Sequence, residues 1–588
     1  MADMAVPTSV TRIPAELRAR IDDQVRQALE RRWVERIWAR DTSVWTNDEK
    51  VAGLIANRLG WLDLPTGFVD RLDPLDAFAA EIRDEGLIRA VVAGMGGSTL
   101  APAVLAAAMA PGGPGITVDV LDSTDPDAVR AATDASDPNG TLYAIASKSG
   151  TTTEPLAFLA HFWHVEDELH TDIPEGEAGL HFVAISDPAP SISHIPHSDL
   201  FRELFLNPED IGGRYSALSY VGLVPGSLMG IDLRALMAAA HDMADSCSVN
   251  AADNPGLQLG VALGTLALAG RDKLTLVIEP QIAALGMWIE QLIAESTGKQ
   301  GIGILPVATE PLGSVGVYSD DRVFVRVSGG SDAAWQAQTD QQLAALAEAG
   351  HPVMDLATAT EAPLGAEFFR WEFATAVAGA VLGINPFDEP NVTESKDNTR
   401  RVLDQYRHEH RLPAQEPLVN EGSLTLTGDA PLRLTGTKGA LADELRRHLS
   451  RVKPRGYFAL QAYIAPTPER DQALRDIATL LRNRSARAVT VGFGPRFLHS
   501  TGQLHKGGPP TGCFLQLTAG HPNDLEIPGW HETFGILIDA QAAGDFMSLE
   551  AHDLPVARIN LGDDPDGGLN ELHAALAAAL ADLISRQG

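Results

Sequence analysis

The sequence predicts an α/β protein with parallel sheets, and three observations support this. Short apolar segments recur along the chain, and several of them end in a turn rich in glycine, serine or threonine that opens a helical stretch. Strands that alternate with helices in this way form parallel sheets with helical crossovers. The chain has 588 residues, 45% of them hydrophobic, which is enough for about three or four domains.

The N-terminal part begins with helices and continues into a first α/β domain. We expect residues 1–86 to form a helical segment, because apolar positions recur with helical spacing between residues 14 and 60. Residues 87–250 are expected to form the first α/β domain. Its expected strands are residues 87–93, 116–121 and 141–146.

Two further α/β stretches follow. Residues 251–411 are expected to form a second domain that is related in fold to the first, although the two sequences have diverged. Residues 412–588 are expected to form a C-terminal α/β domain behind a proline-containing linker. The second domain has expected strands at 274–278 and 322–327 and helices at 283–295 and 367–384. The C-terminal domain has expected strands at 457–465, 488–494 and 512–517.

The net charge excludes several classes of partner. Asp and Glu number 78 against 45 Lys and Arg, so the formal charge is −33. Such a chain repels nucleic-acid backbones and anionic membranes unless it gathers a basic patch, and no run of Lys or Arg forms one. We therefore expect no nucleic acid and no membrane among its partners, and the simplest role of the bulk charge is solubility.

Cysteine use and hydropathy favour a soluble cytoplasmic protein. Cys247 and Cys513 lie far apart, so they give neither a disulfide framework nor a thiolate cluster for a metal. Residues 1–20 lack the apolar core of a signal peptide. The longest apolar stretches, such as residues 373–384, are shorter than the roughly 20 residues that span a bilayer.

Two turns that follow expected strands carry candidate phosphate ligands. The turn at residues 147–152 opens a helix, where backbone N–H groups and the helix dipole favour an anion. Its hydroxyls add donors without adding charge, and the turn at residues 94–99 follows another strand in the same way. An ordinary turn with an N-cap explains one Ser or Thr but not a cluster, so we favour phosphate binding. The candidate ligands are Gly97, Ser98, Ser147, Lys148, Ser149, Thr151 and Thr152.

Arg214, Gln291 and Glu295 are candidates for chemistry on the substrate itself. Arg214 follows two glycines, and its permanent charge suits an oxyanion; the alternative is a surface arginine in a turn. Gln291 and Glu295 lie four residues apart on one face of an expected helix, so the amide can orient a hydroxyl while the carboxylate takes a proton. The alternative for this pair is a solvated helix face with a glycine cap.

Four motifs in a fixed order resemble the glucose-6-phosphate isomerase family. They are the turn beginning at Ser147, Gly212-Gly213-Arg214-Tyr215-Ser216, Glu295-Ser296-Thr297-Gly298-Lys299, and Asn385-Pro386-Phe387-Asp388 leading to Lys396. The likeness spans residues 87–396 and looks closest to the branch fused to transaldolase in some bacteria, although no transaldolase accompanies it here. That branch also resembles the C-terminal stretch around Gln503-Leu504-His505-Lys506-Gly507-Gly508 and residues 534–546.

The resemblance implies a fold and an activity. The fold is two sugar-isomerase (SIS) domains with parallel-sheet α/β sandwich architecture, plus N-terminal helices and an additional C-terminal α/β block. The activity is isomerisation of glucose 6-phosphate and fructose 6-phosphate by ring opening and a cis-enediol, a step of glycolysis and gluconeogenesis that needs no metal and no cofactor. The family also implies a homodimer, although the C-terminal block is able to replace contacts that a partner subunit supplies.

The resemblance also implies roles for individual residues. Glu295 matches the base that moves a proton between C2 and C1, and burial would raise its pKa toward the working pH. Arg214 matches the residue that stabilises the enediolate oxygen. Gln291 matches a substrate-orienting glutamine, and Lys396 matches a lysine that assists ring opening. Ser147, Ser149 and Thr152 match phosphate-binding positions, with Gly97 and Ser98 on the neighbouring turn.

One departure from the family pattern concerns the group that opens the sugar ring. The family usually carries Gly-Gln-His soon after the catalytic glutamate, whereas residues 310–321 contain no histidine. We hypothesise that His505 supplies this function from the C-terminal block, with Lys506 near the phosphate or the ring oxygen. The alternative is a surface histidine in a loop. His499 is expected to serve local hydrogen bonds only.

The second departure lies in the motif that leads to Lys396. Here Phe387-Asp388-Glu389-Pro390-Asn391-Val392-Thr393-Glu394-Ser395-Lys396 replaces the commoner Gln and Val-Glu, while the spacing to Lys396 survives. The alternative for Lys396 is a helix-surface lysine that pairs with Glu394 or Asp397.

Two other functions fit part of the pattern. A non-catalytic phosphosugar sensor keeps the phosphate turn, but it needs no base, so Glu295 and Arg214 argue against it. An isomerase of another phosphosugar, such as mannose 6-phosphate, shares the motifs and differs in pocket shape. Because the proposed substrate is an anion, we expect positive groups in the cleft, among them Lys396 and Lys506, to set it apart from the negative surface.

Overall fold

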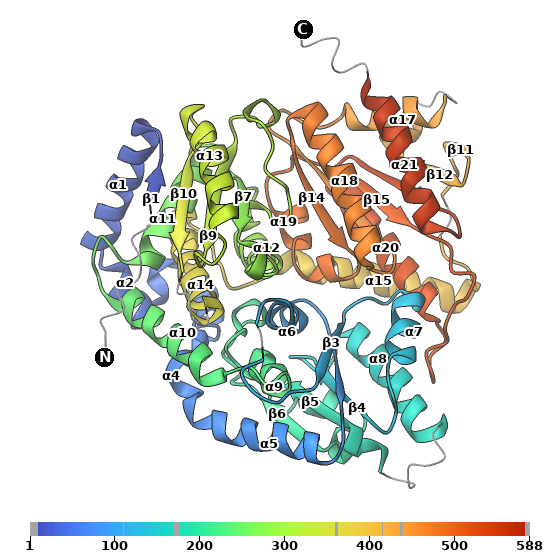
Figure 1. Ribbon diagram of the computed structural model, residues 1–588. Coiled ribbons are helices and arrows are strands. Elements are labelled where there is room, and N and C mark those ends of the chain that lie inside the picture. The colour runs from blue at the N-terminus through green and yellow to red at the C-terminus, as the bar shows by residue number, and fades with distance from the viewer. Residues whose placement is uncertain are drawn as a thin grey trace.

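The computed structural model describes residues 10–109, 111–169, 177–358, 363–413, 415–434 and 439–581, and within these residues the strands form three sheets (Figure 1). Two sheets have five strands and the third has six. Most neighbouring strands are parallel, which confirms the predicted α/β class. We call the parts built on these sheets the first unit, the second unit and the C-terminal block.

The N-terminal segment packs onto the second unit. Its first strand, β1 (Val10–Arg12), pairs antiparallel with β10 (Val353–Ala357) of the second sheet. Ile21, Trp33 and Ile37 are buried in the large apolar core that these helices share with the first two units, as the helical spacing predicts. The helices are α1 (Ala15–Glu30), α2 (Trp33–Trp38), α3 (Glu49–Ala56), α4 (Leu64–Gly67) and α5 (Leu72–Asp84).

The first unit contains a parallel sheet of order β3-β2-β4-β5-β6. All three expected strands are present, and residues 141–146 have the expected bounds. The strands are β2 (Arg89–Gly94), β3 (Thr117–Leu121), β4 (Thr141–Ala146), β5 (Phe182–Ser186) and β6 (Glu203–Leu206). The helices are α6 (Gly97–Ala108), α7 (Pro126–Asp134), α8 (Thr153–His164), α9 (Tyr220–Leu228) and α10 (Leu233–Ser248).

The second unit repeats the strand order of the first. In the first unit β2 lies between β3 and β4, and β5 lies beyond β4. In the second unit β7 lies between β8 and β9, and β10 lies beyond β9. Strand β9 therefore corresponds to β4. The strands are β7 (Lys273–Ile278), β8 (Leu305–Val307), β9 (Arg322–Ser328) and β10. The helices are α11 (Pro255–Leu268), α12 (Leu285–Thr297), α13 (Ala333–Glu348), α14 (Pro363–Leu382) and α15 (Pro390–Glu409).

The C-terminal block contains a mixed sheet of order β11-β12-β16-β15-β13-β14, in which only β11 and β12 run antiparallel to their neighbours. Its strands are β11 (Val419–Glu421), β12 (Leu424–Gly428), β13 (Tyr457–Tyr463), β14 (Ala488–Phe493), β15 (Gly512–Thr518) and β16 (Val556–Asn560). Its helices are α16 (Ala430–Leu434), α17 (Leu441–Leu449), α18 (Pro468–Ser485), α19 (Gly502–Gly507), α20 (Phe534–Ala551) and α21 (Pro565–Leu580).

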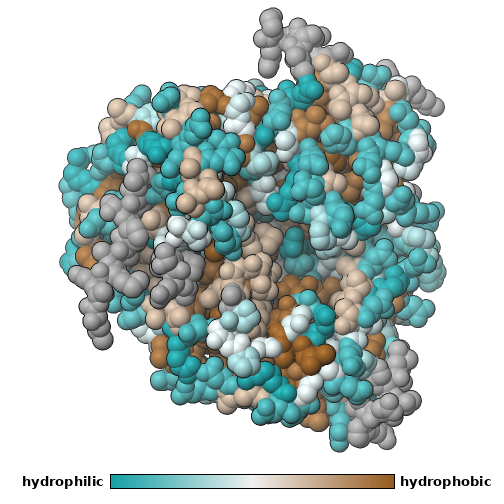
Figure 2. Space-filling view, viewed as in Figure 1, coloured by the Kyte–Doolittle hydropathy of each residue, from teal (hydrophilic) through white to brown (hydrophobic). Residues whose placement is uncertain are grey.

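The C-terminal block packs against both other units. Phe534 and Leu537 of α20 share an apolar cluster with Phe158 of the first unit, and Tyr457 of β13 shares another with Leu305 of the second unit. The block therefore covers the junction of the two units (Figure 1). The face of the molecule in Figure 2 is mostly hydrophilic, as expected at a charge of −33, with an apolar area over the first unit.

Candidate active site

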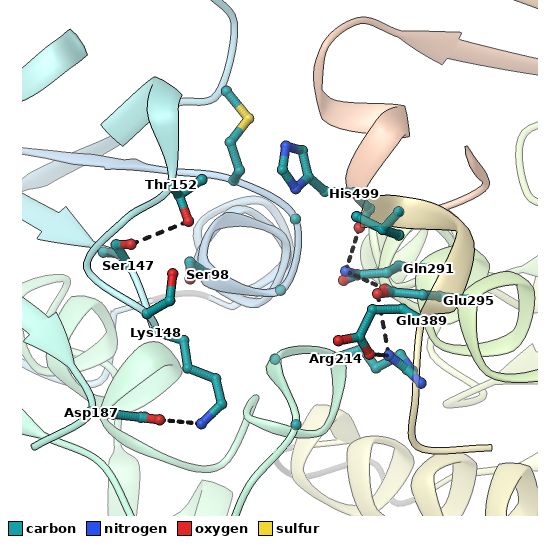
Figure 3. A pocket seen from close by; sticks show the side chains of 18 of the residues that line it. Ser98, Ser147, Lys148, Thr152, Asp187, Arg214, Gln291, Glu295, Glu389 and His499 are labelled. Carbon is teal, nitrogen blue, oxygen red and sulfur yellow. Dashed lines mark hydrogen bonds and ion pairs between the residues drawn. The ribbon is translucent and has the colours of Figure 1, made fainter. Parts of the chain in front are cut away.

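A cavity of about 480 Å³ lies where the first unit, α12, α15 and the short helix η11 (Arg496–His499) meet (Figure 3). Parallel sheets place the carboxyl ends of their strands at one edge, and ligand sites of α/β proteins form there. Ser98, Ser147, Lys148 and Thr152 lie on one side of the cavity in Figure 3, and Arg214, Gln291, Glu295, Glu389 and His499 lie on the opposite side.

The cavity lining contains most of the residues that the sequence predicts. These are Gly97, Ser98, Ser147, Lys148, Ser149, Thr152, Arg214, Gln291, Glu295 and Lys396. Thr151 is exposed next to the lining, and its hydroxyl lies 3.0 Å from that of Ser149. His505 and Lys506 lie elsewhere and are discussed below.

The turn after β4 forms the candidate phosphate cradle. Ser147 is buried, and its hydroxyl donates to Thr152 Oγ1 at 3.3 Å. Lys148 pairs with Asp187 and also donates to the backbone oxygen of Glu209 at 3.2 Å. Helix α8 begins directly after this turn, so its first N–H groups and the hydroxyls face a ligand together.

The turn after β2 reaches the cavity because glycines occupy its positions of closest approach. A Cβ on Gly97 would overlap the carbonyl oxygen of Gly213, and a Cβ on Gly96 would lie 2.8 Å from the carbonyl oxygen of His499. Gly96 also has a φ of +55°, which glycine adopts without strain. The glycines therefore let three segments that are distant in sequence meet at one wall of the cavity.

The equivalent turn of the second unit is occupied by the chain itself. The Glu279 carboxylate accepts hydrogen bonds from the backbone N–H groups of Gly329, Gly330 and Asp332 at 2.6, 3.1 and 2.6 Å. The hydroxyls of Ser328 and Ser331 donate to it as well, at 3.2 and 2.7 Å. Burial disfavours the charged form, but these hydrogen bonds lower the pKa of Glu279. An internal carboxylate thus fills the position that an external anion would take.

Helix α12 positions Gln291 and Glu295 on one buried face, as their spacing predicts. The Gln291 side chain donates to Glu295 Oε2 at 3.0 Å and to the backbone oxygen of His499 at 2.8 Å. The pKa of Glu295 is raised, because burial and the neighbouring Glu389 disfavour its charge more than Arg214 and Gln291 favour it. A raised pKa suits a carboxylate that takes and returns a proton.

Arg214 is buried beside Glu295. Its Nη1 lies 3.2 Å from Oε1 of Glu295 and 3.0 Å from Oε2 of Glu389. Burial disfavours the charged form, yet Glu295 and Glu389 raise the pKa of Arg214 further. The surface-arginine alternative is therefore wrong, and the geometry fits a fixed positive charge beside a base.

Lys396 lines the cavity from α15, although its side chain is largely exposed. The partners expected from the alternative interpretation are engaged elsewhere. Glu394 lies 2.9 Å from His552, and Asp397 pairs with Arg400 at 2.8 Å.

The expectation that His505 and Lys506 face the substrate is corrected by the structure. Both lie in α19 and are buried, at 3% and 6% exposed, outside the cavity lining. His505 Nδ1 lies 2.8 Å from the Tyr457 hydroxyl, and Lys506 pairs with Asp545 at 2.6 Å. Burial and Lys506 lower the pKa of His505 to about 3. His505 is thus a neutral core histidine, neither a cavity acid nor a surface residue.

The histidine that lines the cavity is His499, for which the sequence predicts only local hydrogen bonds. Its Nε2 lies 3.1 Å from Oε1 of Glu154, and the Gln541 side chain donates to the same oxygen at 2.7 Å. Burial would raise the pKa of Glu154, but His499 lowers it. With Nε2 donating to this carboxylate, Nδ1 is left to accept a proton from a ligand.

Charges in the cavity lining balance. Four cationic and four anionic side chains line it, so it is neutral within a chain of −33. The cations are Arg58, Lys148, Arg214 and Lys396, and the carboxylates are Asp187, Glu209, Glu295 and Glu389. The cavity therefore differs from the rest of the molecule as expected, without Lys506.

The described part of the chain holds no group of three or more His, Cys, Asp or Glu side chains placed to bind a metal ion. Nor does any of its helices combine the length and the apolarity that crossing a membrane requires.

Comparisons with known proteins find similar chains. The sequence profile of a family described as phosphoglucose isomerase matches residues 82–304. A glucose-6-phosphate isomerase of Symbiobacterium thermophilum is 31% identical over 394 residues, which cover 58% of this chain and 86% of the relative. That of Rubrobacter xylanophilus is 28% identical, over 57% of this chain and 88% of the relative.

Solved structures share the fold. A protein of Thermus thermophilus described as hypothetical superimposes with a TM-score of 0.56 at 25% identity, over 67% of this chain and 100% of its own. A glucose-6-phosphate isomerase of Chlamydia trachomatis gives a TM-score of 0.50 at 19% identity, over 64% of this chain and 78% of its own.

Proposed function

The chain belongs to the glucose-6-phosphate isomerase family and interconverts glucose 6-phosphate and fructose 6-phosphate, and we propose that it does so in the cavity between the Ser147 turn and α12. The observation that carries this assignment is the pair of Glu295 and Arg214, 3.2 Å apart and opposite a cradle of hydroxyls and backbone N–H groups. A phosphosugar that is anchored at one end can then present its C1 and C2 to a base and a fixed cation.

The phosphate is bound by the turn after β4. Ser147, Ser149 and Thr152 donate hydroxyl hydrogen bonds, and the first N–H groups of α8 point at the anion. Lys148 remains tied to Asp187, so its charge acts from the edge of the site. This arrangement holds a dianion mainly with neutral donors, as an acidic protein requires.

Ring opening falls to His499. Opening a cyclic sugar requires removal of a proton from the hydroxyl at C1 and delivery of a proton to the ring oxygen. His499 is held by Glu154, which Gln541 fixes in turn, and this orients the imidazole toward the cavity with Nδ1 as the proton acceptor. Lys396, which lines the same cavity, is placed to donate toward the ring oxygen.

Proton transfer falls to Glu295. Its carboxylate takes the proton from C2 of the open aldose and returns it to C1, while the hydroxyl proton at C2 passes to the oxygen at C1. The reverse reaction starts at C1. Arg214 stabilises the negative enediolate oxygen that forms between the two steps. Gln291 donates to Glu295 at 3.0 Å and keeps the carboxylate aimed into the cavity.

A coupled assay with fructose 6-phosphate tests these roles. Glu295→Gln keeps the shape of the side chain but removes the base, so we expect turnover to fall by at least about 10³-fold. The matched control is Glu290→Gln on the same helix, because Glu290 lies outside the cavity lining and its loss should leave turnover near the wild-type value. A wild-type chain without turnover would contradict the function, and an active Glu295→Gln variant would contradict the base.

Three finer assignments belong to the same proposal. We assign the chain to the branch that resembles the transaldolase-fused enzymes, and we place it in the cytoplasm with the rest of glycolysis. The C-terminal block contributes His499 to the cavity lining, and we propose that the site works within a single subunit even where two chains associate. Activity measured across a dilution series tests this last point.

A further inference from the structure

Within the described residues, all five N–H groups of Arg214 have partners. Nε donates to the Ser296 hydroxyl at 2.7 Å. Nη2 donates to the backbone oxygens of Pro386 and Asp388, both at 2.9 Å. Nη1 lies between two carboxylates, 3.0 Å from Glu389 and 3.2 Å from Glu295. An enediolate oxygen can therefore reach Arg214 only if one partner gives up its place.

Exposure identifies the partner that can yield. The Ser296 side chain is fully buried and two acceptors belong to the backbone, so these bonds are fixed. The Glu295 side chain is 9% exposed, whereas that of Glu389 is 43% exposed and can turn into solvent. Glu389 also stands at the N-cap of α15 without capping it by a side-chain hydrogen bond. Its carboxylate is therefore committed to Arg214 and not to the helix.

We propose that Glu389 is a positioning residue that occupies Arg214 in the free enzyme and yields its place to the enediolate oxygen of the substrate. This inference rests on the proposed function of the site. While no substrate is bound, Glu389 neutralises a buried guanidinium and keeps it aligned. Because Glu389 shares Nη1 with Glu295, it also prevents Arg214 from fully neutralising the base.

The charges around Glu295 support this arrangement. Arg214 faces Glu295 from the turn after β6, Lys299 from the end of α12, and Glu389 from the start of α15, with the neutral Gln291 beside it. Burial disfavours the charge of both carboxylates, yet Arg214 lowers the pKa of Glu389 while the pKa of Glu295 stays raised. Loss of the Glu389 charge should therefore lower the pKa of Glu295.

Glu389→Gln tests the inference, because the amide still accepts a hydrogen bond from Arg214 but carries no charge. We expect the acid limb of the pH profile of kcat/KM to move to lower pH, by about half a pH unit to one pH unit. We expect KM for fructose 6-phosphate to fall about threefold, because a negative charge beside an anionic substrate is gone. Glu389→Asp keeps the charge and should retain the wild-type acid limb.

The control is Glu394→Gln, which removes a carboxylate of α15 that pairs with His552 and not with Arg214; its pH profile should match the wild type. Melting temperatures verify folding, and Glu389→Ala serves if the amide variant does not fold. An unmoved or upward-shifted acid limb with unchanged KM would overturn the role of Glu389. That result differs from failure of the proposed function, in which the wild-type chain itself does not turn over.

Discussion

Three carboxylates at the site have pKa values that are shifted in different directions because their neighbours differ. Glu295 has a raised pKa, since burial and Glu389 outweigh the attraction of Arg214. Glu389 is partly exposed and Glu154 is buried, and the pKa of each is lowered, by Arg214 in the first case and by His499 in the second. Pairs of titratable groups whose surroundings push their pKa values apart are typical of acid–base sites. The base Glu295 and the orienting residues Glu389 and Glu154 thus have the same carboxylate group, and their different contacts give them different roles.

His499 and His505, which both lie in the C-terminal block, allow a direct comparison at this scale. His499→Ala removes the imidazole that lines the cavity, so we expect turnover of the cyclic sugar to fall by about 10²-fold. His505→Ala removes a core side chain that contacts Tyr457, so we expect a lower melting temperature with kcat within about twofold of the wild type. The coupled assay and thermal unfolding measure both.

The comparison has a clear contrary outcome. If His505→Ala abolished turnover in a folded protein while His499→Ala did not, ring opening would belong to the histidine that the structure buries. Substrate supplied in the open-chain form should restore much of the activity of His499→Ala, since proton transfer at Glu295 does not depend on the imidazole.

At the scale of elements, two units of one topology have different turns at equivalent positions. The turn after β4 is open and lined with hydroxyls, whereas the turn after β9 is filled by Glu279. Both turns precede a helix, so both present N–H groups to an anion. The choice of one residue after β7 decides which of the two is free for substrate.

Glu279→Gln tests how tightly the second turn is held. The amide places N–H groups against backbone donors, so we expect the free energy of unfolding at pH 7 to fall by about 2 to 4 kcal/mol, with KM for fructose 6-phosphate unchanged. Because hydrogen bonds lower the pKa of Glu279 in the folded state, its contribution is fully present above the unfolded value of about 4.3 and is lost as pH falls through the folded value. Denaturant unfolding at several pH values measures this; a difference between the two proteins that grows toward acid would refute it.

The sequence was a good guide to elements and a poorer guide to contacts between them. Residues 141–146 form a buried apolar run bounded by turns, and their bounds as β4 were predicted correctly. β11, at the sheet edge, and its neighbour β12 were missed, because short antiparallel strands carry little pattern of their own.

Contacts that depend on tertiary packing were missed for a physical reason. The turn, Arg214 and Glu295 come together in the order that their motifs predict. His499, the partner of Glu154, lies 345 residues away in the sequence. The spacing of neighbouring residues cannot predict a contact between residues so far apart. His505 was misjudged in the same way, since its glycine-rich surroundings predict a loop while packing buries it in α19.

At the scale of the whole molecule, the charge of −33 surrounds a cavity whose own lining is neutral. Long-range repulsion therefore opposes the approach of a dianionic phosphosugar, while short contacts inside the cavity favour its binding. The two effects respond differently to salt, because solvent-exposed charges beyond a Debye length are screened and buried pairs are screened much less.

Raising the ionic strength should therefore accelerate the enzyme at low substrate concentration. Between about 10 and 150 mM sodium chloride the Debye length falls from about 30 to about 8 Å, so we expect kcat/KM for fructose 6-phosphate to rise about twofold as the surface repulsion is screened. kcat at saturating substrate should not change with salt, because turnover of the bound substrate does not depend on how fast the substrate approaches the cavity. Phosphate and sulfate salts are avoided, since they compete for the Ser147 turn. A steady fall of kcat/KM over this range would mean that attraction inside the cavity, and not the net charge of the chain, governs capture of the substrate.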